Sequence, residues 1–188
     1  MNLEETRNLN RQQVIDAIDD GTLQINDECF LWTIDKGLVY EDNLEWTWDK
    51  QCWKMMEEIA ELELAIDKRD AGEIEGELGD CLFVLSNLVN ISKLKIESKD
   101  VMDDNKAVIL SKVDLFKNIN RFKNTKSVIE TINKAIFNSI SEINDLGIDI
   151  EPDLRYILYK TLMKNTDKSG KNINGNFVKQ EDLEKENK

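Results

Sequence analysis

The stretch EEIAELELAIDKRDAGEIEGELGDCLFVL, residues 57–85, predicts two helices that fold back on each other at a turn in residues 67–72. Before the turn, apolar residues recur at helical spacings of four, three and four, at Met55, Ile59, Leu62 and Ile66. After the turn, a second apolar stripe follows at Leu78, Leu82, Leu85 and Val89. We therefore predict helices over 46–66 and 73–94 that pack as an antiparallel hairpin.

One acid lies inside the apolar part of this stretch. Asp80 follows Leu78 and Gly79 and precedes the run CLFVL. Burial of an unpaired carboxylate costs several kcal/mol or forces a shift of its pKa. The sequence therefore predicts a positive partner beside Asp80.

Four acids share a spacing on the two predicted helices. Glu58 and Glu61 are three residues apart on the first, and Glu77 and Asp80 repeat this spacing on the second. Both pairs are equally far from the turn, so the hairpin brings four carboxylates together. A hard cation, Mg²⁺ or its substitute Mn²⁺, suits such an all-oxygen site, and Glu57 could orient or deprotonate a metal-bound water. Acids three apart are also common on solvated faces, so geometry alone leaves both interpretations open.

Composition excludes several classes of protein. The chain of 188 residues has no histidine, which excludes Ser-His-Asp and Cys-His nucleophile systems and most zinc sites. Its net charge of −13 predicts a surface that repels nucleic acid and anionic lipid. The start MNLEETRNLNRQQ lacks the apolar segment of a signal peptide, and no apolar run approaches the length of a membrane span. We expect a cytoplasmic protein whose three cysteines are reduced.

The rest of the chain also favours helices. Further helices are predicted over 10–21, over 27–37 with Asp27 as N-cap and Gly37 as the stop, and over 101–120, 125–145 and 152–164. We find no convincing strand. The expected organisation is one all-α domain, a helical bundle over 1–170, followed by a polar loop and mobile tail over 171–188.

Two segments carry a resemblance to a known family. KMMEEIAELELAI followed by GELGDCLFVLSNLV resembles the paired Glu-Glu-x-x-Glu and Glu-x-x-Asp motifs of the MazG-like all-α nucleoside triphosphate pyrophosphohydrolases. Upstream, FLWTIDKGLV is similar to the family's first helix, with Lys36 where the family often has arginine. The resemblance is strong over 30–91, weaker over 159–179, where YKTLMKNTDKSGK resembles an Asn-x-x-Lys element, and absent over 95–150.

The resemblance implies Mg²⁺-dependent hydrolysis of a (deoxy)nucleoside triphosphate to the monophosphate and pyrophosphate, in house-cleaning or control of nucleotide pools. It implies a catalytic or metal-binding role for Glu57 and phosphate contacts from three residues near the C-terminal end. The metal ligands that it implies are Glu58, Glu61, Glu77 and Asp80. The phosphate-binding residues that it implies are Lys164, Asn165 and Lys168. Taken alone, the two lysines are more typical of a solvated helix end, and the asparagine of a C-cap.

The tryptophans offer a place for a nucleobase. Trp32 and Trp48 are candidates to stack on the base, with core packing as the alternative for each, and Trp53 is assigned to the core. Two other functions stay open: a dimeric dUTPase or dCTP pyrophosphatase of narrow specificity, and a non-catalytic helical interaction protein with a vestigial site. Apolar stripes on several helices also predict a homodimer or homotetramer, which light scattering would test.

Overall fold

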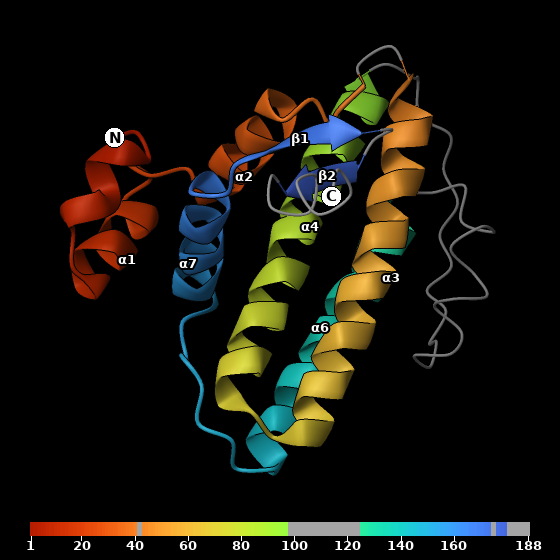
Figure 1. Cartoon of the computed structure of the whole chain (residues 1–188). Helices are drawn as coiled ribbons and strands as arrows, with labels where there is room; N and C mark the ends of the chain where they lie inside the picture. The colour runs from red at the N-terminus through yellow and green to blue at the C-terminus, as the bar shows by residue number, and fades with distance from the viewer. Residues whose placement is uncertain (41–42, 98–124, 174–175, 180–188) are drawn as a thin grey trace, which may run out of the picture.

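The computed structural model describes residues 1–40, 43–97, 125–173 and 176–179. The all-α class is confirmed, with six α-helices among the described residues (Figure 1). The helix predicted over 101–120 lies outside these residues. In chain order the elements are the 3₁₀-helix η1 (Glu4–Asn8), α1 (Arg11–Asp19), α2 (Ile25–Asp35), α3 (Leu44–Lys68), α4 (Ala71–Glu97), α6 (Thr125–Asp145), α7 (Leu154–Thr166), β1 (Gly170–Ile173) and β2 (Asn176–Lys179).

The predicted helical hairpin is present as α3 and α4, with a turn shorter than expected. Arg69 takes a left-handed backbone conformation, with φ 57°, and ends α3. Asp70 Oδ1 then accepts a hydrogen bond from the Glu73 amide at 3.0 Å and caps α4. Because one residue ends the first helix and the next caps the second, α3 continues to Lys68 and α4 begins at Ala71.

The main core lies between α3, α4 and α6 (Figure 1). All four residues of the predicted α3 stripe are buried. On α4 the prediction was only partly right, because Leu78 is buried whereas Leu82, Leu85 and Val89 are half-buried. Helix α4 contacts α2, α3, α6 and α7, so its buried residues lie on several faces of the helix instead of in one stripe. The buried apolar residues of α4 are Ile74, Leu78, Cys81, Phe83, Val84, Leu88 and Ile91.

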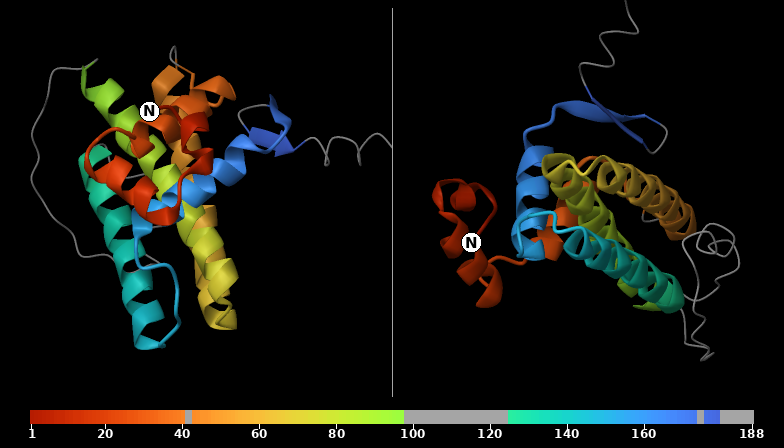
Figure 2. Two further views of the ribbon diagram at one scale, coloured as in Figure 1. Left: turned by 90° about the vertical axis from the view of Figure 1, so that its left-hand side faces the viewer. Right: turned by 90° about the horizontal axis from the view of Figure 1, so that it is seen from below.

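A second core joins the N-terminal segment to α7. The Tyr159 hydroxyl donates a hydrogen bond to the Thr6 carbonyl at 3.1 Å, and Arg7 Nη2 pairs with Asp167 Oδ1 at 2.8 Å. The N-terminal helices lie against α7 on the side away from α3 (Figure 2). Through these contacts the start of the chain holds the helix that carries Lys164.

Helix α2 begins earlier than predicted. Its N-cap is Gln24, and Asp27 lies in its first turn, so the prediction of Asp27 as the cap was wrong. Because Ile25 is buried in the core beside α7, the helix begins at Ile25, two residues before Asp27. The helix stops where predicted, because Gly37 has a φ of 65°, which favours glycine.

A β-hairpin replaces part of the predicted C-terminal loop. Strands β1 and β2 pair antiparallel, with Gly170 opposite Lys179. Asn172 Nδ2 donates hydrogen bonds to the Gly37 carbonyl and to the Tyr40 hydroxyl, the latter at 3.0 Å. The Phe177 ring packs edge-on against Trp32, with centroids 5.5 Å apart. Contacts with residues about 140 positions earlier hold the strands, and two four-residue strands carry too little periodicity to be recognised locally.

Several large apolar side chains are exposed. Trp53 was predicted to lie in the core, but 60% of its surface is accessible, so this prediction was wrong. The buried face of α3 runs through Cys52, Met55 and Met56, which turns Trp53 outward. Leu64 and Phe137 are similarly exposed, and a second copy of the chain covering such residues stays a prediction. In the described part of the chain, no helix is both long and apolar enough to cross a membrane.

Candidate active site

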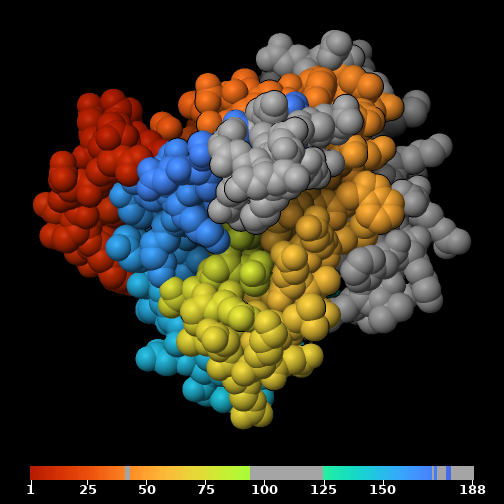
Figure 3. Space-filling model, viewed as in Figure 1, coloured from red at the N-terminus to blue at the C-terminus, as the bar shows by residue number. Residues whose placement is uncertain are grey.

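A pocket of about 700 Å³ lies between α2, α3, α4, α7 and β2. The middle of α4 is recessed between α7 and α3 in the space-filling view (Figure 3) and forms the floor of this pocket. Most predicted site residues line it, although they come from segments more than 130 residues apart. The predicted residues that line the pocket are Trp32, Glu57, Glu58, Glu61, Glu77, Asp80, Lys164, Asn165 and Lys168.

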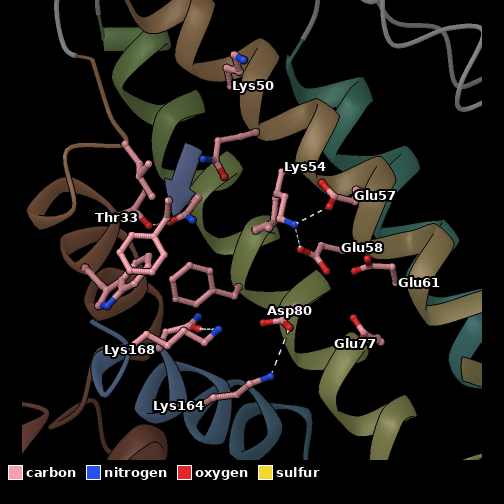
Figure 4. Close-up of a pocket in the computed structure, with 18 residues that line it drawn as sticks. Thr33, Lys50, Lys54, Glu57, Glu58, Glu61, Glu77, Asp80, Lys164 and Lys168 are labelled. Atoms are coloured by element: carbon pink, nitrogen blue, oxygen red, sulfur yellow. Dashed lines mark hydrogen bonds and ion pairs between the residues drawn. The ribbon is translucent and has the colours of Figure 1, made fainter. Parts of the chain in front are cut away.

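Carboxylates from both helices of the hairpin meet at one side of the pocket (Figure 4). Oxygen atoms of Glu58, Glu77 and Asp80 all lie within 4.8 Å of one another. Glu58 is buried, with 4% of its surface accessible, whereas Glu77 and Asp80 are half-buried. Glu61 lines the same side of the pocket but is not one of these three. The structure thus brings together the acids that the sequence placed in register across the turn.

The crowding of these acids changes their protonation. Burial raises the pKa of Glu58 to about 7, and the charges of Asp80 and Glu61 add to the rise, although the Lys54 ammonium opposes it. Burial also raises the pKa of Glu77, again with the help of Glu61 and Asp80. Without a further cation, the cluster therefore holds protons that the same groups would release in water.

This protonation predicts a pH-dependent response to metal. The folded chain keeps a proton on Glu58 that the unfolded chain releases above its ordinary pKa of 4.5. The free energy of unfolding of the metal-free protein should therefore fall as the pH rises from that value, and the loss should be complete above about pH 7. Bound Mg²⁺ would offset this loss, so the increase in melting temperature that Mg²⁺ causes should be larger at about pH 8.5 than at about pH 5.5. Differential scanning fluorimetry measures both, and an equal increase at the two pH values would contradict the assignment.

Lysines lie around the acids. Lys54 Nζ is 2.7 Å from Glu58 Oε1 and 3.2 Å from Glu57 Oε1. Lys164 Nζ is 3.8 Å from Asp80 Oδ2, so a lysine places positive charge beside the acid for which the sequence predicts a metal ion. One turn further on, Lys168 Nζ donates a hydrogen bond to the buried Asn165 Oδ1 at 2.6 Å. In the pocket, Lys54 lies beside the carboxylates of α3, and Lys164 and Lys168 lie across from them (Figure 4).

The donor set fits a hard divalent cation. Every donor of the cluster is a carboxylate oxygen, which Mg²⁺ and Mn²⁺ prefer, and the chain contains no histidine to favour a softer metal. Burial and the neighbouring carboxylates raise the pKa of Glu58 and Glu77 although lysines lie nearby, and a bound cation would oppose this rise. Glu58, Glu77 and Asp80 are therefore the residues that could hold the ion, with Glu61 beside them.

Aromatic side chains form another part of the pocket wall. Trp32 lies edge-on to Phe83, with centroids 5.4 Å apart, and edge-on to Phe177. Lys36 Nζ lies 5.8 Å from the centroid of the Trp32 ring. Trp48, in contrast, is buried in the main core and does not line the pocket. The structure therefore brings Trp32 to the site but not Trp48.

Several lining residues were missed by the sequence analysis. Thr33 and Asn87 are buried at the pocket wall, with their side-chain oxygens 3.0 Å apart. They are 54 residues apart in sequence, and no local pattern links them. Phe177 lies in a segment predicted as loop. The role of Lys54 could have been recognised from the sequence, because it precedes Glu58 by four residues, a spacing typical of ion pairs within a helix.

Comparison with protein families agrees with this site. Residues 51–112, a third of the chain, match the model of the MazG nucleotide pyrophosphohydrolase domain. The matched segment contains all five acids of the pocket, and the predicted resemblance is confirmed over 51–91. The match extends to residue 112, so the prediction that the resemblance is absent from residue 95 onward was wrong for 95–112. No curated protein and no solved structure matches the chain. The chain is thus an all-α protein, a third of which is similar to the MazG nucleotide pyrophosphohydrolase domain.

Proposed function

We propose that the protein hydrolyses a (deoxy)nucleoside triphosphate to the nucleoside monophosphate and pyrophosphate, with Mg²⁺ as cofactor. The observation that carries this proposal is the group of three carboxylates on α3 and α4, which faces Lys164 across one pocket. The match to the MazG nucleotide pyrophosphohydrolase domain supports the reaction class. Phosphoryl transfer depends mainly on positioning and on neutralisation of charge, and this pocket offers both.

Each group in the pocket has a task in this reaction. Mg²⁺, when bound to the carboxylates, supplies positive charge that neutralises the phosphates. Lys164 and Lys168 bind phosphate oxygens, and Asn165 holds Lys168 in place through the hydrogen bond between their side chains. Glu57, which is exposed in the pocket, accepts the proton of the attacking water. A new P–O bond forms, the bridge between the α- and β-phosphates breaks, and the pyrophosphate leaves.

The aromatic side chains of the pocket wall offer a binding site for the nucleobase. Trp32 and Phe177 come from segments far apart in the sequence and offer ring surfaces to a planar base, which stacking favours by about 1–3 kcal/mol. A nucleobase at this wall would leave the triphosphate free to extend along α4 towards Asp80. The pocket walls thus match the two chemical parts of a nucleotide.

A nucleotide panel tests the proposal. The protein is incubated with each ribo- and deoxyribonucleoside triphosphate, with dUTP included, and release of pyrophosphate is measured with Mg²⁺ and with excess chelator. We expect release for at least one nucleotide, and only with the metal. Release from dUTP or dCTP alone would assign a narrow specificity. If no nucleotide is hydrolysed and Mg²⁺ causes no thermal shift, the chain is a helical interaction protein instead.

A further inference from the structure

Lys54 has a position that neither the metal site nor the proposed reaction explains. It lies on α3, four residues before Glu58 and three before Glu57, and its ammonium bridges both carboxylates. Its partner Glu58 is the most buried of the three clustered acids. No other ion pair to Glu58 is present in the described part of the chain. The Lys54 ammonium thus neutralises the most buried acid of the cluster, while Lys164 lies beside Asp80 (Figure 4).

This position conflicts with a bound divalent ion. Glu58 belongs to the group whose oxygens lie within 4.8 Å of one another, so an ion in the cluster would lie close to the ammonium. Two like charges at such a distance repel, and the divalent ion attracts the carboxylates about twice as strongly as the ammonium does. Lys54 must therefore give up its contact with Glu58 when the metal enters.

The displaced Lys54 side chain can turn into the pocket. Lys54 carries its ammonium on a flexible four-carbon stem, and 46% of its side-chain surface is accessible. It lines the same pocket as Lys164 and Lys168, so it can turn into the space that the phosphates would occupy. A triphosphate brings negative charge to this space, and an ammonium released from the acids would find new partners there.

We propose that Lys54 occupies the acid cluster as a stand-in cation until a divalent ion displaces it, and that it then binds the phosphates of the substrate. The second half of this proposal rests on the proposed function; the first half does not. Metal and substrate binding are thereby linked, because the metal releases a lysine that the nucleotide can use.

Titration of Lys54→Met with Mn²⁺ in the absence of nucleotide tests the first half. Removal of the competing ammonium should tighten Mn²⁺ binding by about tenfold relative to the wild type. Isothermal titration calorimetry at about pH 8.5 measures the affinity while keeping proton competition small. Lys50→Met is the matched control, since Lys50 lines the same pocket one turn earlier but has its ammonium 5.2 Å from the centroid of the Trp46 ring. Its Mn²⁺ affinity should stay within about twofold of the wild type, because its charge does not contact the acids.

Binding of a non-hydrolysable triphosphate tests the second half. With saturating Mn²⁺, Lys54→Met should bind the analogue about tenfold more weakly, although it binds the metal more tightly. These opposite changes distinguish the proposal from a structural role, in which loss of Lys54 would weaken both affinities. Circular dichroism verifies folding, and Lys54→Gln replaces Lys54→Met if the latter does not fold.

The outcomes separate the two proposals. Weaker Mn²⁺ binding by folded Lys54→Met would overturn the first half, because the ammonium would then support the site instead of competing for it. Unchanged affinity for the analogue would overturn the second half. Failure of the proposed function would instead appear as a wild-type protein that releases no pyrophosphate, with the metal titrations unaffected.

Discussion

Replacement of Asp80 by asparagine is expected to lower the rate of pyrophosphate release by at least about 10³-fold, equivalent to about 4 kcal/mol of transition-state stabilisation. The substitution keeps the shape of the side chain but removes one of three charges whose oxygens lie within 4.8 Å of one another. It also removes the carboxylate that faces Lys164 across 3.8 Å. Both the metal and the lysine would lose a partner.

Two further measurements make this result specific. Glu73→Gln is the matched control, because Glu73 lies on the same helix but pairs with Lys68 outside the pocket. A surface pair of this kind contributes about 0–1 kcal/mol, so the rate should stay within about twofold of the wild type. The metal-free melting temperature of Asp80→Asn should not fall, since the variant has less repulsion between acids. An active, folded Asp80→Asn protein would refute the assignment of the site.

Gly79→Ala is expected to lower the free energy of unfolding by about 1–3 kcal/mol. Gly79 is buried where α4 meets α7, and an added methyl group would overlap Thr161 Oγ1 and lie 3.2 Å from Ile157 Cγ2. Helix α7 would have to move away, and Lys164 would move with it. Pyrophosphate release should therefore fall together with stability. Urea denaturation followed by circular dichroism measures the free energy of unfolding.

The same helix provides the control for this steric argument. Gly76 lies one turn earlier, and an added methyl group there would have no atom within 4 Å, so Gly76→Ala should be neutral or stabilising by up to about 1 kcal/mol. Thr161→Ala removes the overlapping hydroxyl, and combined with Gly79→Ala it should restore at least about 1 kcal/mol. Equal stability of Gly76→Ala and Gly79→Ala would show that close packing of α4 on α7 is not required.

The acidic hairpin was predictable because the residues that determine it are close together in the sequence. Glu58 and Glu61 repeat the spacing of Glu77 and Asp80, and a turn without room for another element places the pairs opposite each other. Helical period and distance from the turn were enough to place the cluster. A positive charge beside Asp80 was also predictable from the cost of burying a charge, although Asp80 is half-buried where its apolar neighbours predicted burial.

Other features depend on neighbours that the sequence does not reveal. Helix α4 contacts four other helices, so the single predicted stripe included only Leu78 among the buried apolar residues described for this helix. Trp53 is as apolar as a core residue, yet the faces of α3 that pack on α4 and α6 are defined by Cys52 and Met55. The contact between Thr33 and Asn87 and the packing of Phe177 on Trp32 exist only once distant segments meet.

The contact between the two ends of the chain has a consequence for biosynthesis. Thr6 and Tyr159 are 153 residues apart, so their hydrogen bond closes a loop that contains α1, α2, α3, α4 and α6. During translation the acidic hairpin can form early, since α3 and α4 are consecutive, whereas α7 leaves the ribosome only after both of them. Until then the nascent chain carries a concentrated patch of negative charge without the lysines of α7. During this interval Lys54, which lies on α3 itself, is already in place to neutralise Glu57 and Glu58.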